Sequence, residues 1–473
     1  MKRRDFFRNT AFAAAGATVL TPFRSIAGNN DRNLGHPPGK TAKNIIFMVS
    51  DGMSIGTLSM ANMLNERRAG RLCEWMSLYH DGVVSRGLMD TASANSLVTD
   101  SAAASSSWGG GIRVNNGALN VAPDGSHPIP ILQKFKAANK AVGCVTSVPI
   151  THATPAGFCV NSNSRSDQPG IALMYHDLRF DVMMGGGTEF FSAEKREDKQ
   201  DVFGKFAASG FQVAKTREEM LAIDAGAKDA PILGVFHQDG LPYALDREHD
   251  ETLKNGTPAL AEMVGTAIRH LQKNPNGFVL QVEAGKVDWA AHANDVGALL
   301  YDQLAFDEAV ATAIAFAEAD GDTMVIITTD HGNANPGLFS GSKATTNFER
   351  IMDFRHTNDW ILQGISRDFT PAQVRERIEY AQDIAVSGDE AKQILSYYVT
   401  EPNEDGLYNP YKLPFRDLAA IQERYTSVGW GSMGHSGDHV EIAVYGAGRE
   451  LLKPFVRNTD MHNLMLEAAG VHQ

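Results

Sequence analysis

Carboxylate and imidazole side chains flank four apolar runs of the 473-residue chain, at 44–50, 277–283, 323–329 and 440–446. They are Asp51, Glu283, Asp288, His292, Asp330, His331 and His435. Carboxylate and imidazole together suit Zn²⁺, whereas carboxylate and hydroxyl oxygens suit Mg²⁺. A single aspartate at the end of a strand is more often a helix cap than a ligand. Four such places on one edge of one sheet predict a metal centre.

A second stretch, "LVTDSAAASSSWGGG" (97–111), contains four serines and could be either a low-complexity linker or a catalytic segment. Ser101 follows Asp100 at an expected helix start, and the amino end of a helix favours anions. We expect Ser105, Ser106 and Ser107 to be small packing residues inside this helix, which the glycines at 109–111 end. The position of Ser101 therefore favours a nucleophile over a linker.

A third stretch, "THATPAGFCVNSNSR" (151–165), offers His152, Thr154 and Arg165. The planar guanidinium of an arginine can hold two phosphoryl oxygens at once. The chain therefore combines candidate metal ligands, a candidate phosphate-binding arginine and a candidate serine nucleophile.

The elements that must position these residues alternate between strands and helices. Continuous apolar runs at 44–50, 141–148, 277–283, 323–329 and 440–446 are typical of buried parallel strands. Helical patterns such as 258–274 and 299–319 lie between them. This alternation predicts an α/β fold, a doubly wound, mostly parallel sheet with helices on both faces. Ligands bind beyond the carboxyl ends of the strands in such sheets, which is where the polar residues fall.

The amino-terminal segment and the composition indicate how the chain is organised. Residues 1–27, with "MKRRDFF" and a short apolar run, predict a twin-arginine signal peptide, and hence export to the periplasm or beyond. Residues 28–473 are expected to form one catalytic domain, with an insertion at about 335–430 that caps or flanks the site. The net charge of −13 argues against nucleic-acid binding, and no later apolar run reaches the ~18 residues of a membrane span.

We expect Cys73, Cys144 and Cys159 to be buried thiols, of which at most one pair could bridge.

Taken together, these residues and their order along the chain make the sequence resemble the alkaline phosphatase family. The resemblance rests on motifs in the family's order across most of residues 42–450: "VSDGM" (49–53), "VTDSAA" (98–103), "THATPA" (151–156) with Arg165, "DVMMGGG" (181–187), "VEAGKVDWAAH" (282–292), "TTDHG" (328–332) and "GHSGDHVEIAVYG" (434–446). The insertion is the least covered part. The resemblance implies hydrolysis of small phosphate monoesters with an alkaline optimum, and we also expect a homodimer.

The resemblance also implies two zinc ions, one magnesium ion and a phosphoserine intermediate. Asp288, His292 and His435 would bind the first zinc, and Asp51, Asp330 and His331 the second. Asp51 would also bind magnesium, together with Thr154 and Glu283. Ser101 would be the nucleophile, and Arg165 would hold the phosphoryl group.

Two positions vary within the family. His152 stands where some members have aspartate, and Trp289 stands where some have lysine, so this chain lacks one cation near the phosphate. Both are expected to lie next to the substrate or behind the magnesium ligands, which leaves the identity of the third metal open. Lys286 is expected to be solvated.

Other functions remain open at this stage. A phosphodiesterase, a sulfatase or a phosphoglycerate mutase could use the same scaffold, although a sulfatase would need a proline where Ala103 stands. The alternative that is not an enzyme is a periplasmic protein that binds metal or phosphate, for which Ser101 would have no use.

Overall fold

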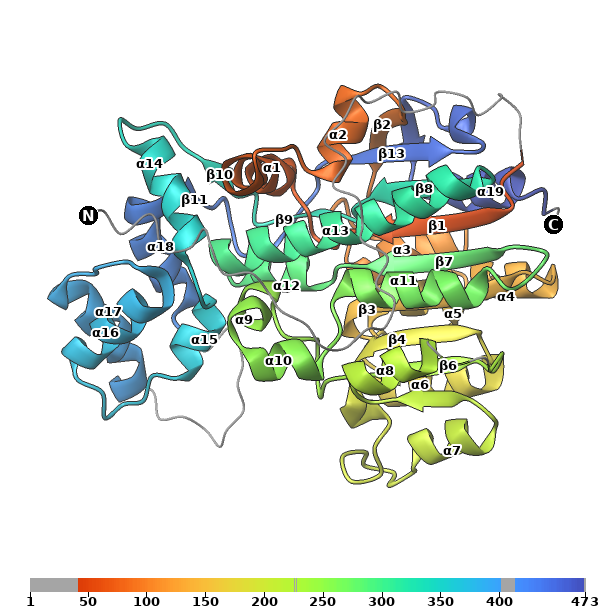
Figure 1. The fold of residues 1–473 in the computed structure, drawn as a ribbon, viewed down its shortest axis with the longest axis horizontal. Helices are drawn as coiled ribbons and strands as arrows, with labels where there is room; N and C mark the ends of the chain where they lie inside the picture. The colour runs from red at the N-terminus through yellow and green to blue at the C-terminus, as the bar shows by residue number, and fades with distance from the viewer. Residues whose placement is uncertain (1–40, 225, 227, 401–412, 472–473) are drawn as a thin grey trace, which may run out of the picture. The chain divides into compact units, whose positions relative to one another are not determined.

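The structure is a computed structural model that describes residues 41–224, 226, 228–400 and 413–471. The expected signal peptide at 1–27 lies outside these residues. A ten-stranded sheet forms the centre, in the order β14-β2-β13-β8-β1-β7-β3-β4-β6-β5 (Figure 1). The strands are β1 (Asn44–Val49), β2 (Ser85–Asp90), β3 (Ala141–Pro149), β4 (Val182–Gly186), β5 (Gln212–Ala214), β6 (Ile232–Val235), β7 (Phe278–Glu283), β8 (Thr323–Thr328), β13 (Val440–Gly446) and β14 (Phe455–Arg457).

Strand β1 shows why these runs are continuously apolar. Its alternate residues face two different cores, with Ile45 and Phe47 in one and Ile46 and Met48 in the other. Both faces of the sheet are therefore covered by helices, as the doubly wound prediction requires. The chain pairs β1 with β7 and β8 in parallel. The run at 440–446 was expected to be parallel, and this was wrong: β13 is antiparallel to both β2 and β8.

Helices cover the sheet on both sides (Figure 1). One side carries α3 (Ser101–Gly109), α4 (Ile131–Ala137), α5 (Ala153–Cys159), α6 (Gln168–Leu178), α7 (Val202–Ala208) and α19 (Asp460–Ala468). The other carries α2 (Glu74–His80), α8 (Arg217–Asp224), α11 (Leu260–Leu271), α12 (Lys286–His292) and α13 (Val296–Asp320), with α1 (Ile55–Ala69), α9 (Ala244–His249) and α10 (Glu251–Gly256) beside them. The three cysteines are buried and free, as expected, with Sγ of Cys144 and Cys159 3.6 Å apart.

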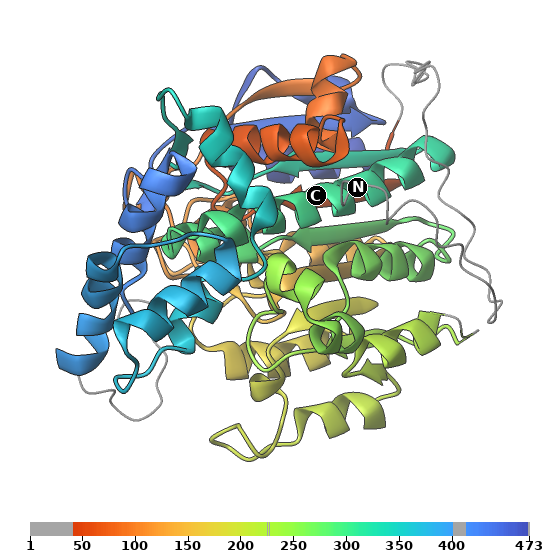
Figure 2. The same ribbon diagram turned by 60° about the vertical axis from the view of Figure 1, so that its left-hand side comes forward.

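The expected insertion follows β8 and contains its own small core. Its residues 401–412 lie outside the residues that the structure describes. Its helices are α14 (Ala344–Glu349), α15 (Asn358–Gln363), α16 (Pro371–Gln382), α17 (Gly388–Thr400) and α18 (Phe415–Thr426). Two short pairs join it to the sheet, β9 (Gly332–Asn333) with β12 (His435–Ser436) and β10 (Gly337–Leu338) with β11 (Val428–Gly429). Figure 2 shows these cyan and blue helices beside one end of the sheet. Buried carboxylates anchor the start of α15: Asp246 accepts from Thr357 and Asp295 accepts from the amide of Asn358.

Candidate active site

The carboxyl ends of β1, β7 and β8 bring the predicted ligands together, because neighbouring parallel strands end at the same edge. Three groups have ligand atoms within 4.8 Å of one another: Asp288, His292 and His435; Asp51, Asp330 and His331; and Asp51, His152 and Glu283. The first two groups are those expected from the sequence. Asp51 belongs to two groups and so lies at the centre of the site.

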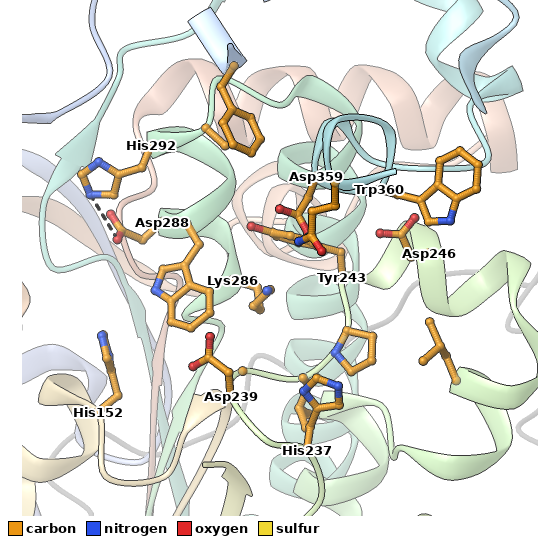
Figure 3. Close-up of a pocket in the computed structure, with 18 of the residues that line it drawn as sticks. His152, His237, Asp239, Tyr243, Asp246, Lys286, Asp288, His292, Asp359 and Trp360 are labelled. Carbon is orange, nitrogen blue, oxygen red and sulfur yellow. Dashed lines mark hydrogen bonds and ion pairs between the residues drawn. The ribbon is translucent and has the colours of Figure 1, made fainter. Parts of the chain in front are cut away.

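The first group is held in place by a well-defined hydrogen-bond shell. Helix α12 places Asp288 and His292 one turn apart, with Nε2 of His292 3.4 Å from Oδ2 of Asp288 (Figure 3). Asn333 donates to Oδ1 of Asp288 at 2.7 Å, and Nδ1 of His292 donates to the carbonyl of Met433 at 2.8 Å. Hydrogen bonds of this kind fix the tautomer and leave Nε2 free to bind a metal.

The second group is fully buried and tightly packed. Nε2 of His331 lies 3.1 Å from Oδ2 of Asp330 and 3.6 Å from Oδ1 of Asp51. Gly52 takes a φ of +66° and its amide donates to Asp330 at 2.9 Å. A Cβ at position 52 would lie 2.4 Å from the carboxylate of Asp288. The glycine in "VSDGM" therefore allows the two groups to approach each other.

The third group contains two of the three expected magnesium ligands, Asp51 and Glu283, together with His152. The third expected ligand, Thr154, also lies here, since its hydroxyl donates to Asp51 at 3.3 Å. Nδ1 of His152 lies 3.6 Å from Oε1 of Glu283. Thr146 also donates a short hydrogen bond to Glu283. No sequence pattern pointed to Thr146, which lies within the buried strand β3.

The donor atoms in these groups fit bound cations. Four buried atoms of these groups have no hydrogen-bond partner among the described residues: Oδ1 of Asp51, Oδ2 of Asp330, Oε1 of Glu283 and Nδ1 of His152. Burial, and then the neighbouring carboxylates, raise the pKa of Asp51. Buried carboxylates this close together normally pair or coordinate metals. Burial, followed by His331, lowers the pKa of His435 to about 4, so this imidazole is neutral at pH 7 and can act as a ligand.

Ser101 is the first residue of α3, and Asp100 caps the helix by accepting from the amide of Ala103 at 2.9 Å. Oγ of Ser101 lies 3.4 Å from Nε2 of His331. The three serines that follow are buried within the helix, which Gly110 terminates, as predicted. The segment 97–111 is thus not a linker.

Arg165 is oriented by two partners. Nη1 lies 3.1 Å from Asp100, and Nη2 lies 3.0 Å from Nε2 of His152. The same Asp100 that caps α3 therefore positions the arginine, and this second role could not be predicted from the sequence. His152 lies between Arg165 and Glu283, and its ring lies 6.3 Å from that of Trp289 in an edge-to-face arrangement.

A cavity of about 930 Å³ contains Ser101, His152, Arg165 and Trp289 in its wall and reaches residues of the insertion, including Trp360. Residues of the insertion therefore form part of the wall of this cavity. Lys286 also lines this cavity and is only 6% exposed, so the expectation that it is solvated was wrong.

The fold and this site together define an α/β protein with three groups of side chains that can bind metal ions at one edge of its sheet. The profile of the family described as "Alkaline phosphatase" matches residues 42–471. The chain belongs to the alkaline phosphatase family, and it is a phosphoric monoester hydrolase.

Known relatives agree with this assignment. The chain is 29% identical to alkaline phosphatase 3 of Bacillus subtilis (strain 168), over 90% of this chain and 88% of that one. It is 28% identical to alkaline phosphatase 4 of the same organism, over 97% and 94%. The crystal structure of Thermus thermophilus alkaline phosphatase superposes with a TM-score of 0.84 at 30% identity, covering 96% of each chain.

Proposed function

We propose that the protein hydrolyses phosphate monoesters at alkaline pH through a phosphoserine on Ser101. The observation that carries this proposal is the position of Ser101 Oγ, at the amino end of α3 and 3.4 Å from His331 in a buried metal-capable group. A protein that only bound metal or phosphate would gain nothing from a serine at this point.

We assign Zn²⁺ to the groups of Asp288, His292 and His435 and of Asp51, Asp330 and His331 because they combine imidazole with carboxylate. Asp51, Thr154 and Glu283 offer oxygen and fit Mg²⁺, although His152 adds a nitrogen. When bound, these ions stabilise negative charge on the entering and leaving oxygens and favour deprotonated hydroxyl groups.

The side chains of the protein supply the remaining steps. Oγ of Ser101 attacks phosphorus in line, and the bond from phosphorus to the ester oxygen breaks as the alcohol leaves. Arg165, held by Asp100, binds two of the non-bridging oxygens and neutralises their charge. Water then cleaves the phosphoserine, which releases inorganic phosphate and restores the hydroxyl.

A metal analysis combined with an activity panel tests this function. We expect zinc and magnesium in the purified protein and a strong preference for a monoester over a diester and a sulfate ester with the same alcohol. A preference for the diester would instead favour a phosphodiesterase.

We also propose that the protein is exported through the twin-arginine route and that it acts as a homodimer. The basic and apolar stretch at 1–27 supports export. No helix in the part of the chain that the structure describes is both long and apolar enough to span a bilayer. N-terminal sequencing of the secreted protein and light scattering would test the two proposals.

A further inference from the structure

The active-site cavity is much larger than a phosphoryl group requires. Its volume of about 930 Å³ lies at the upper end of the range for pockets that enclose whole organic ligands, which is roughly 300–1,000 Å³. Its lining runs from Ser101 and Arg165 to Trp360 and Arg377 of the insertion. The part of the cavity beyond Arg165 can therefore enclose the alcohol portion of the substrate.

Lys286, the first residue of α12, lies in the wall of this part of the cavity (Figure 3). Its side chain is 94% buried, since only 6% of the residue is exposed. Nζ lies 3.6 Å from the ring centre of Tyr243 and 4.6 Å from that of Trp289. Two aromatic rings therefore contact the amine and hold it at the cavity wall.

Among the described residues, Nζ of Lys286 makes no hydrogen bond and no ion pair, although the backbone amide of Lys286 donates to Ser147 at 3.2 Å. An ammonium group has three hydrogen-bond donors, and buried polar groups nearly always find acceptors. Aromatic faces attract the charge but do not satisfy three N–H groups. The unused donors, in the wall of a substrate cavity, indicate an acceptor on the ligand.

The charge around Lys286 indicates which kind of acceptor this is. Asp239, Asp246 and Asp359 line the same cavity. A second anionic group on the ligand would face these three carboxylates and be repelled. A neutral oxygen, such as a hydroxyl, would accept from Nζ without this repulsion.

We propose that Lys286 donates a hydrogen bond to a hydroxyl group of the leaving alcohol, and that the preferred substrates are phosphate monoesters of polyhydroxylated alcohols such as sugars. This inference rests on the proposed function, hydrolysis at Ser101. Trp289 and Tyr243 add apolar ring surface that suits the C–H faces of a sugar ring. Lys286 is thus a specificity-determining residue.

The test compares glucose 6-phosphate with cyclohexylmethyl phosphate, which has the same ring size and no hydroxyl groups, on the metal-loaded enzyme. A site built to hydrogen-bond a hydroxyl discriminates strongly against an analogue that lacks it. We expect wild type to favour glucose 6-phosphate at least ~10-fold in kcat/KM, and Lys286→Met to reduce this ratio ~10-fold. Lys254→Met, an exposed lysine of α10, is the matched control and should keep the wild-type ratio.

Two results would overturn the inference. The first is a wild-type kcat/KM for glucose 6-phosphate that is close to that for cyclohexylmethyl phosphate, whether or not Lys286→Met folds. A ~10-fold preference for glucose 1,6-bisphosphate over glucose 6-phosphate that disappears in Lys286→Met would show an anion subsite in place of a hydroxyl subsite. Trapping of phosphoserine on wild type separates these results from a failure of the proposed function, since that failure would leave no label on Ser101.

Discussion

The Nε2 atoms of His292 and His435 lie 3.0 Å apart, and the Nδ1 atom of each ring lies within 2.9 Å of a backbone carbonyl. Each Nδ1 therefore carries the hydrogen, so two Nε2 lone pairs face one another beside the carboxylate of Asp288. Two lone pairs this close repel unless a cation binds both. This relationship is the clearest sign in the chain of a built metal site.

Removal of divalent metal is expected to lower the melting temperature, because the facing lone pairs and buried carboxylates lose their counter-charge. Zinc at about 100 times its dissociation constant should raise the free energy of unfolding by about 2.7 kcal/mol. His435→Ala should weaken zinc binding, whereas His439→Ala, whose ring packs against Phe455, should not. Differential scanning fluorimetry with chelator and zinc measures this. A melting temperature that does not respond to chelation would count against the site.

Arg165→Ala is expected to weaken transition-state binding and inhibition by inorganic phosphate together. Loss of two charged hydrogen bonds costs about 2–3 kcal/mol, which is roughly 30- to 150-fold in kcat/KM. Arg113→Ala removes an arginine that pairs with Asp90 at 2.8 Å and serves as the control. If phosphate inhibits Arg165→Ala as strongly as wild type, the assignment of Arg165 fails.

Trp289→Lys is expected to lower the inhibition constant of phosphate and to lower kcat at alkaline pH, because an added cation would hold the product. His152→Asp should strengthen magnesium binding by adding a carboxylate beside Glu283. The rings of His152 and Trp289 lie 6.3 Å apart, so we expect the two effects to be non-additive. Steady-state inhibition of both single variants and the double variant measures this. Strict additivity would show that the two positions do not act on a shared site.

The contribution of Asp307 to the stability of the protein is expected to fall between about pH 4 and pH 7. This carboxylate accepts from the amides of Glu74 and Trp75, and burial raises its pKa from 3.8 to about 6. The folded state therefore holds the proton more tightly than the unfolded state, and this contribution is lost as pH rises through 6. The difference corresponds to at most about 3 kcal/mol.

Asp307→Asn should remove that part of the pH dependence, whereas Asp389→Asn, at an exposed aspartate, should not. Urea unfolding at pH 4, 5, 6, 7 and 8 gives the free energy of unfolding at each pH, and hence its slope against pH. Equal slopes for wild type and Asp307→Asn would mean that Asp307 titrates alike in both states.

Local pattern was enough to predict five of the ten strands and to bring the candidate ligands to one edge, because burial on both faces leaves an unbroken apolar run and parallel strands end at one edge. It could not give strand direction: the run at 440–446 is as apolar as its neighbours, yet β13 is antiparallel. It also missed β2, whose residues alternate in exposure at the less buried side of the sheet.

The contacts that orient the site join residues far apart in the chain and leave no local signal. Asn333 supports Asp288 across 45 positions, and Thr146 supports Glu283 across 137. Lys286 was expected to be solvated because lysines usually are. Its burial follows from Tyr243, which the fold brings against it from a separate loop.

The most direct test of the central claim is to locate the phosphoryl group on the protein. Wild type is mixed with a radiolabelled monoester and quenched in acid, and the labelled peptide is identified. We expect one labelled phosphoryl group per active site, on Ser101, in wild type and in Ser105→Ala. Ser105 is a buried serine one turn further along α3. We expect no label on Ser101→Ala, even if slow hydrolysis persists. Label that remains on Ser101→Ala would contradict the account.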